Sequence, residues 1–238
     1  AYESFAVNDA NGQADYGETV GLDVTVKNIG NEAASNIQVT LASNSTDVTI
    51  VDDTASIPSM EAMSEYTLTN AFQIAVNELI ADGAQVNFIL TCTDGSHTWT
   101  SPFRMTLHAP VFDLAEFRPV QTVNPGGDGQ LLVSITNIGS SDARNARLQL
   151  YSSTSDLSFT QTIHDIDLIA AGSTATVVAD FTTSHQFQGN SIVEVQYLLN
   201  ASSYALDGVE LLSIGSVMET FETGDFSAFA WESIGSSH

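Results

Sequence analysis

The chain has 238 residues and a hydrophobic content of 43 %, a length that suits two domains of about 100 residues each. Only 5 Lys and Arg accompany 29 Asp and Glu, which gives a formal net charge of −24. Such a surface repels phosphate backbones and anionic bilayers, so we expect no nucleic-acid partner and no membrane insertion. The single cysteine excludes an intramolecular disulfide, and no run approaches the roughly 20 apolar residues of a membrane span.

The first polar loop runs from Asp9 to Glu18 and is rich in oxygen-bearing side chains. Two glycines, Gly12 and Gly17, let it curl, so that several oxygens could surround a hard cation such as Ca²⁺. It is not an EF-hand, because the sixth and twelfth positions counted from Asp9 are Ala14 and Val20 instead of Gly and Glu. The alternative is an Asx-rich turn without metal. The candidate metal ligands are Asp9, Asn11, Asp15 and Glu18.

Strict alternation of apolar and polar residues follows this loop. Residues 20–26 and 37–41 each place their apolar side chains on one face, on either side of the turn Asn28-Ile29-Gly30. This pattern predicts two neighbouring antiparallel strands with one buried face. The segment from Phe72 to Ile80 could form a short helix of one or two turns.

The next strands meet at a hairpin. Residues 86–92 alternate, Asp94-Gly95 supplies the turn, and residues 99–107 alternate beyond it. The parity of these strands predicts that Cys92 and Trp99 lie on the buried face. Pro110 then interrupts the strand pattern, and we expect a domain boundary there.

An internal repeat is the most informative feature of the chain. Residues 17–50 align without gaps with residues 126–159, and Asn28-Ile29-Gly30 recurs as Asn137-Ile138-Gly139. Alternating strands recur at 131–135, 146–150 and 193–199. We therefore predict an all-β fold of two tandem immunoglobulin-like Greek-key β-sandwiches, at residues 1–110 and 111–215.

The last segment, residues 216–238, is too short to bury its own aromatic residues, and we expect it to be the truncated start of a third module. Residues 1–10 have neither the basic nor the apolar region of a signal peptide. The chain is therefore expected to be a piece of a longer protein. The aromatic residues of the last segment are Phe221, Phe226, Phe229 and Trp231.

Two stretches of the chain carry a family resemblance. The run GETVGLDVTVKNIGNEAASNIQVTL resembles bacterial cell-adhesion-related immunoglobulin-like repeats, and residues 80–110 resemble the repeats that follow the protease domain of gingipain-like secreted cysteine peptidases. The tail ETFETGDFSAFAWES is similar to the start of jelly-roll adhesin modules. The resemblance implies a non-catalytic accessory region on a secreted bacterial cell-surface protein. It also implies an acidic, glycine-containing loop before the Gly-Glu-Thr strand, matched here only at the four candidate ligands named above.

No catalytic residue is predicted, and the chain is not expected to be an enzyme. Cys92 lacks the cationic surroundings that activate a thiol, and the five histidines show no metal-ligand spacing. The carboxylate pairs Asp52-Asp53 and Asp165 with Asp167 lack a pocket signature. The histidines are His97, His108, His164, His185 and His238.

These observations predict a rigid, acidic spacer whose partners are neighbouring domains of the same polypeptide. Host or matrix proteins and glycans are further candidate partners. The alternative is a carbohydrate- or protein-binding adhesin module with no peptidase attached. Calcium is the one cofactor that the sequence suggests.

Overall fold

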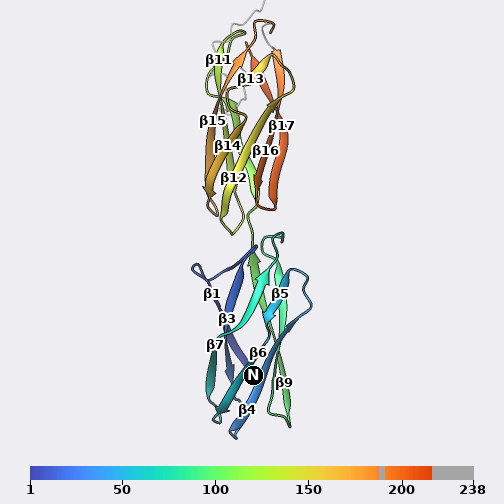
Figure 1. Ribbon diagram of the computed structural model, residues 1–238. Coiled ribbons are helices and arrows are strands. Elements are labelled where there is room, and N and C mark those ends of the chain that lie inside the picture. Colours follow the sequence, from blue (N-terminus) through green and yellow to red (C-terminus); the bar gives the residue numbers. More distant parts are fainter. Residues whose placement is uncertain (188–190, 216–238) are drawn as a thin grey trace, which may run out of the picture.

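The computed structural model describes residues 1–187 and 191–215, which form two β-sandwiches joined end to end (Figure 1). The described residues form strands and turns, and none of them forms a helix that could cross a membrane. The prediction of an all-β fold with tandem immunoglobulin-like sandwiches is confirmed. The expected third module at 216–238 lies outside the described residues.

The first sandwich consists of two sheets. The four-stranded sheet has the order β1 (Tyr2–Asn8), β3 (Thr19–Lys27), β7 (Glu65–Val76) and β5 (Val48–Asp52). The five-stranded sheet has the order β2 (Ala14–Asp15), β9 (Thr98–His108), β8 (Gln85–Thr93), β4 (Ala34–Ser43) and β6 (Thr54–Met60). Neighbouring strands are antiparallel except for β2, which pairs parallel with β9.

The second sandwich repeats this plan. One sheet has the order β10 (Phe112–Pro119), β11 (Asp128–Asn137), β15 (Thr174–Thr183) and β13 (Leu157–Phe159). The other has the order β14 (Ile163–Ile169), β12 (Ala143–Ser152), β16 (Ser191–Ala201) and β17 (Tyr204–Ile214). Each sandwich encloses its own core, with buried residues between Ala14 and Ala109 in one and between Val123 and Ile214 in the other.

The register shows that the repeat extends further than the sequence alignment. Phe5 of β1 pairs with Val24, and Phe117 of β10 pairs with Val133, which is the counterpart of Val24. A register shift interrupts both ladders at the same place, between Tyr2 and Ser4 in one copy and between Leu114 and Glu116 in the other. β1 and β10 are thus equivalent edge strands, a relationship that their sequences do not reveal.

The prediction that the strands on either side of each Asn-Ile-Gly turn are antiparallel neighbours is wrong. β3 and β4 lie in different sheets, and so do β11 and β12. The turn carries the chain across the sandwich from one sheet to the other, so the apolar faces of the two strands meet across the core instead of lying side by side. Period-2 alternation fixes which face is buried, but both arrangements bury the same face.

Two smaller expectations are also corrected. Residues 72–76 continue strand β7, so the helical turn predicted from Phe72 does not form. Phe72, Ile74 and Val76 are buried, as alternation in a strand requires. Trp99 shares its face with buried Phe103 but is 47 % exposed, because its end of the β8–β9 hairpin lies at the open end of the sandwich, where it lines a groove rather than the core.

Candidate functional site

The junction between the sandwiches is held by a polar network around Ser140. The Ser140 hydroxyl donates a short hydrogen bond to Asp82 Oδ1, and it is also bonded to His108 Nδ1 at 2.7 Å. Asp82 Oδ1 accepts a further hydrogen bond from the Ala109 backbone N–H at 3.0 Å. Asp82 and His108 belong to the first sandwich and Ser140 to the second, so the network ties the two together. Burial alone would raise the pKa of Asp82, but the hydrogen bonds from Ser140 and Ala109 lower it.

Two tyrosines, one from each sandwich, complete the junction. The Tyr204 hydroxyl, at the tip of the β16–β17 hairpin, accepts a bond from the Ile80 N–H and donates one to the Ile80 carbonyl, both at 3.0 Å. The Tyr16 hydroxyl donates to the Asp142 carbonyl at 3.3 Å. The two rings meet edge to face, with centroids 5.0 Å apart. Each sandwich therefore contributes one tyrosine whose hydroxyl is hydrogen-bonded to the backbone of the other sandwich.

The Asn137-Ile138-Gly139 turn of the second copy packs against the linker and forms the site that receives it, the linker socket. Asn137 is fully buried, and its Oδ1 accepts hydrogen bonds from the Val111 and Gly139 N–H groups. A Cβ atom on Gly139 would lie only 2.3 Å from the Ala109 carbonyl oxygen, so the linker can approach only because this residue is glycine. In the first copy Asn28 accepts from Gly30, and a Cβ on Gly30 would meet nothing closer than 3.2 Å.

The four candidate metal ligands lie on the segment between β1 and β3, which includes the two-residue strand β2. Asn11 Nδ2 donates to Asp15 Oδ2 at 2.8 Å, and Asn11 Oδ1 accepts from the Gln13 N–H at 2.8 Å. Asp9 Oδ2 accepts from the Asn11 N–H at 3.2 Å. Burial raises the pKa of the Glu18 carboxyl, and the charges of Asp9 and Asp15 raise it further. Asn11 therefore stabilises the loop through its hydrogen bonds and acts as a brace, whereas the carboxylates of Asp9, Asp15 and Glu18 form one region of negative charge.

Sequence reasoning missed a fourth acidic group beside this loop. The Glu78 carboxylate lies 3.0 Å from the position that a Cβ on Gly17 would occupy. Glu78 follows β7 and comes near the loop only through the fold. Among the described residues, no three His, Cys, Asp or Glu side chains gather closely enough to hold a metal ion by themselves.

An apolar groove of about 540 Å³ opens at the far end of the first sandwich. Trp99 lines it and lies nearly parallel to His97, with ring centroids 5.8 Å apart. Cys92 also lines it, and packs against the core while remaining partly exposed, so the prediction of a buried cysteine holds only in part. Burial raises the pKa of the Cys92 thiol, and the N-terminal charge lowers it by a smaller amount. A nucleophilic cysteine needs a lowered pKa instead.

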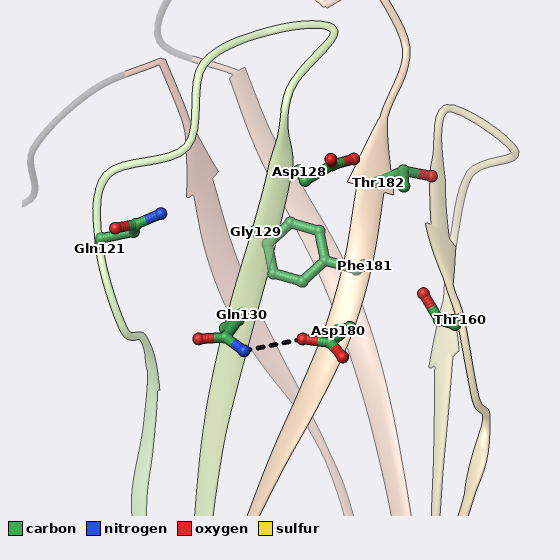
Figure 2. A pocket seen from close by; sticks show the side chains of 8 residues that line it. All are labelled: Gln121, Asp128, Gly129, Gln130, Thr160, Asp180, Phe181 and Thr182. Carbon is green, nitrogen blue, oxygen red and sulfur yellow. Dashed lines mark hydrogen bonds between the residues drawn. The ribbon is translucent and has the colours of Figure 1, made fainter.

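The second sandwich has a shallower hollow of about 450 Å³ on one sheet (Figure 2). The Phe181 ring crosses over Gly129, where a Cβ would come within 2.5 Å of it. Gln130 Nε2 donates to Asp180 Oδ1 at 2.8 Å on the outer face of the sheet, opposite to the core-facing Phe181 ring. Thr182 lies opposite Asp128 in the β11–β15 ladder, but no hydrogen bond joins their side chains in the described part of the chain.

The other candidates for chemistry are dispersed over the described part of the chain. His97 pairs with Asp94 at 3.4 Å in an exposed turn, and His164 contacts the Gln161 carbonyl. Asp165 forms a surface ion pair with Arg147 at 2.9 Å. His238 lies outside the described residues. Among the histidines that the structure describes, His108 is hydrogen-bonded to a serine hydroxyl, that of Ser140 in the second sandwich.

Comparison with known families agrees with this architecture. Residues 5–95 match the CARDB family model. CARDB domains are immunoglobulin-like, cell-adhesion-related and non-catalytic, and the match lies within the first sandwich. No curated protein matches the chain.

Solved structures give weaker likenesses. Red sea bream transglutaminase is 12 % identical over 90 % of this chain and 31 % of its own length, with a TM-score of 0.35. A mutant of Salmonella alpha-2-macroglobulin is 11 % identical over 90 % of this chain and 16 % of its own, with a TM-score of 0.34. A Porphyromonas gingivalis protein of unknown function is 13 % identical over 89 % of this chain and 100 % of its own, with a TM-score of 0.29. These scores are too low to transfer any property to this chain.

Proposed function

We propose that this chain is a non-catalytic spacer that holds neighbouring modules of a cell-surface protein at a fixed separation and orientation. The observation that carries the proposal is the junction, where Ser140 and Tyr204 of the second sandwich bond to the first. Tandem domains joined by a bare linker usually move relative to one another. Here the linker itself is bonded, because Ala109 contacts Asp82 and Val111 contacts Asn137.

The chemistry of the junction supports a fixed orientation. Its hydrogen bonds join several separate pairs of residues across the linker, so a rotation that parts the two sandwiches breaks them. Each bond contributes about 0.5–1.5 kcal/mol, and bonds to a charged group such as Asp82 contribute more. Together they exceed thermal energy several-fold, which favours one docked arrangement.

Distance measurements between two spin labels test the proposal. Cys92→Ala removes the native thiol, and labels are then placed on cysteines introduced at the exposed positions Glu61 and Asp167. We expect one narrow distance distribution, which broadens when Tyr204→Ala and Asp82→Ala are combined. Tyr151→Ala, which removes an exposed tyrosine from the same sheet as Tyr204, is the matched control. A distribution as broad in the parent as in the double variant would refute the spacer.

A specific observation favours one alternative function, that of an adhesin module. Trp99 is 47 % exposed beside an apolar groove, and exposed aromatic rings are the usual platform for sugar rings and protein hot spots. Binding of the chain to a glycan array or to matrix proteins, lost in Trp99→Ala and kept in Tyr151→Ala, would establish this function. Equal binding by the two variants would exclude the groove as the binding site.

We propose further that the parent protein is secreted to a bacterial surface and carries a gingipain-like peptidase domain. The support is the resemblance of residues 80–110 to the repeats of such peptidases, together with the acidic surface. The coding sequence on both sides of this region is the test. A caspase-like domain upstream would support the peptidase, whereas an upstream region made only of further repeats would remove it.

A further inference from the structure

Two buried oxygen atoms in the loop between β1 and β3 have no hydrogen-bond partner. They are Asp15 Oδ1 and Glu18 Oε2, and throughout residues 1–187 and 191–215 no other buried side-chain nitrogen or oxygen is left unpaired. Asp15 is only 8 % exposed. A buried carboxylate oxygen without a partner costs several times the free energy that an ordinary hydrogen bond contributes, so folded proteins rarely keep one. Finding both in a single ten-residue loop requires an explanation.

No ion pair neutralises the carboxylates of this loop in the described part of the chain, although the charge of Arg144 reaches Tyr16. The five ion pairs found there involve none of the loop's carboxylates. Asp9 and Asp15 each act on Glu18 as a like charge, and the Glu78 carboxylate lies next to Gly17. Like charges at close range disfavour one another's ionised form unless a cation lies between them.

The loop holds its carboxylates in place by other means. β2 pairs Asp15 with His108, and the Tyr16 N–H donates to the His108 carbonyl at 3.0 Å. Asn11 fixes the second oxygen of Asp15, and the Glu18 N–H donates to the Asp15 carbonyl at 3.3 Å. The unpaired oxygens are thus anchored on a folded framework rather than on a free chain.

We propose that this loop binds a divalent cation of the Ca²⁺ class, with Asp15 Oδ1 and Glu18 Oε2 as its protein carboxylate ligands. Asp9, the third acidic group of the loop, is exposed and adds negative charge near Glu18 without serving as a ligand. Asn11 serves as a brace, because its oxygen is engaged by Gln13 and its nitrogen by Asp15. All the available donors are oxygens, which excludes a soft metal and suits a hard cation that takes six to eight oxygen ligands. Backbone carbonyls and water supply the remainder, so we expect the weak affinity of extracellular modules, with Kd about 0.1–1 mM.

The position of the site gives the cation a structural consequence. Tyr16, which reaches Asp142 and Tyr204 of the second sandwich, lies between the Asp15 strand and Gly17. A cation that orders this loop also orders the tyrosine that bridges the junction. This consequence rests on the proposed spacer function, whereas the site itself does not.

Calorimetric titration with CaCl₂, beside NaCl of matched ionic strength, tests the site. The parent chain should give a saturable heat, and at ten times Kd the melting temperature of the first sandwich should rise by roughly 5–10 °C. Tb³⁺ should show luminescence sensitised by Tyr16. Asp15→Asn and Glu18→Gln should each weaken binding at least tenfold, whereas Glu61→Gln, which removes an exposed charge from the same sandwich, should bind as the parent does.

The outcomes separate the site from the spacer. No heat and no thermal shift in the folded parent at concentrations well above millimolar would overturn the site. Equal binding by the parent, Glu18→Gln and Glu61→Gln would also overturn it, since the attraction would then be diffuse surface charge. Circular dichroism checks that each variant is folded. If Asp15→Asn does not fold, Glu18→Gln alone tests the site. The spin-label distances recorded in EDTA test the spacer independently of any cation.

Discussion

The linker socket gives the sharpest test of the junction. Gly139→Ala places a Cβ atom 2.3 Å from the Ala109 carbonyl oxygen, 2.5 Å from the Val111 nitrogen and 2.8 Å from the Pro110 carbonyl carbon. All three are backbone atoms of one segment, so no rotamer change relieves the contact. Overpacking of a close-packed site costs about 1–3 kcal/mol, and we expect the upper end of that range here.

Differential scanning calorimetry measures this effect. A loss of about 3 kcal/mol lowers the melting temperature of a sandwich of this size by roughly 12–24 °C, and we expect the fall in the transition of the second sandwich. Gly30→Ala is the matched control, because it occupies the same turn in the first copy and its Cβ would have no contact shorter than 3.2 Å. Neither glycine has a positive φ, so the comparison isolates the steric contact. Similar shifts for Gly139→Ala and Gly30→Ala would show that the linker does not depend on the socket.

Three further outcomes follow from the structure. Tyr204→Phe should lose about 0.5–1.5 kcal/mol for each bond to Ile80 and should reduce the cooperativity between the two thermal transitions, while Tyr151→Phe leaves it unchanged. Because folding lowers the pKa of Asp82, the contribution of this carboxylate to stability should be present above the unfolded pKa of about 4 and be lost as the pH falls through the folded pKa. In Asp82→Asn, the melting temperature should therefore fall less steeply with decreasing pH, and an unchanged acid limb of the profile would contradict this. Iodoacetamide at neutral pH should modify Cys92 at least tenfold more slowly in the folded chain than in urea, and equal rates would mean that the thiol is not protected.

Strand positions and buried faces were predictable because each depends on local sequence alone. The alternation at Leu22, Val24 and Val26 requires a strand with one apolar face, and all three side chains are buried. The partner of that face was not predictable, because a turn that forms a hairpin and a turn that crosses to the opposite sheet leave the same alternation. The prediction that Trp99 is buried was wrong for a related reason. Alternation gives the face on which a side chain lies, but not whether the opposite sheet extends far enough to cover it.

The junction could not be predicted, because its residues follow no pattern. Asp82 and Ser140 are isolated polar residues in turns, Tyr204 begins strand β17, and only the fold brings the three together. One signal was present in the repeat, where Gly139 recurs at the place of Gly30. The candidate cation loop was visible from its oxygen side chains, but only the structure separates Asn11, which is engaged within the loop, from Asp15 and Glu18, which have unpaired oxygens.

The three-residue passage from β9 to β10 also determines how the chain would carry tension. A pull along the long axis passes from His108 through Ala109, Pro110 and Val111 directly into Phe112. The hydrogen bonds of the β8–β9 and β10–β11 ladders run perpendicular to that pull, so they are loaded in shear and must break together. Since resistance to force depends on the rate of unfolding, this geometry should slow unfolding under a pull along the chain.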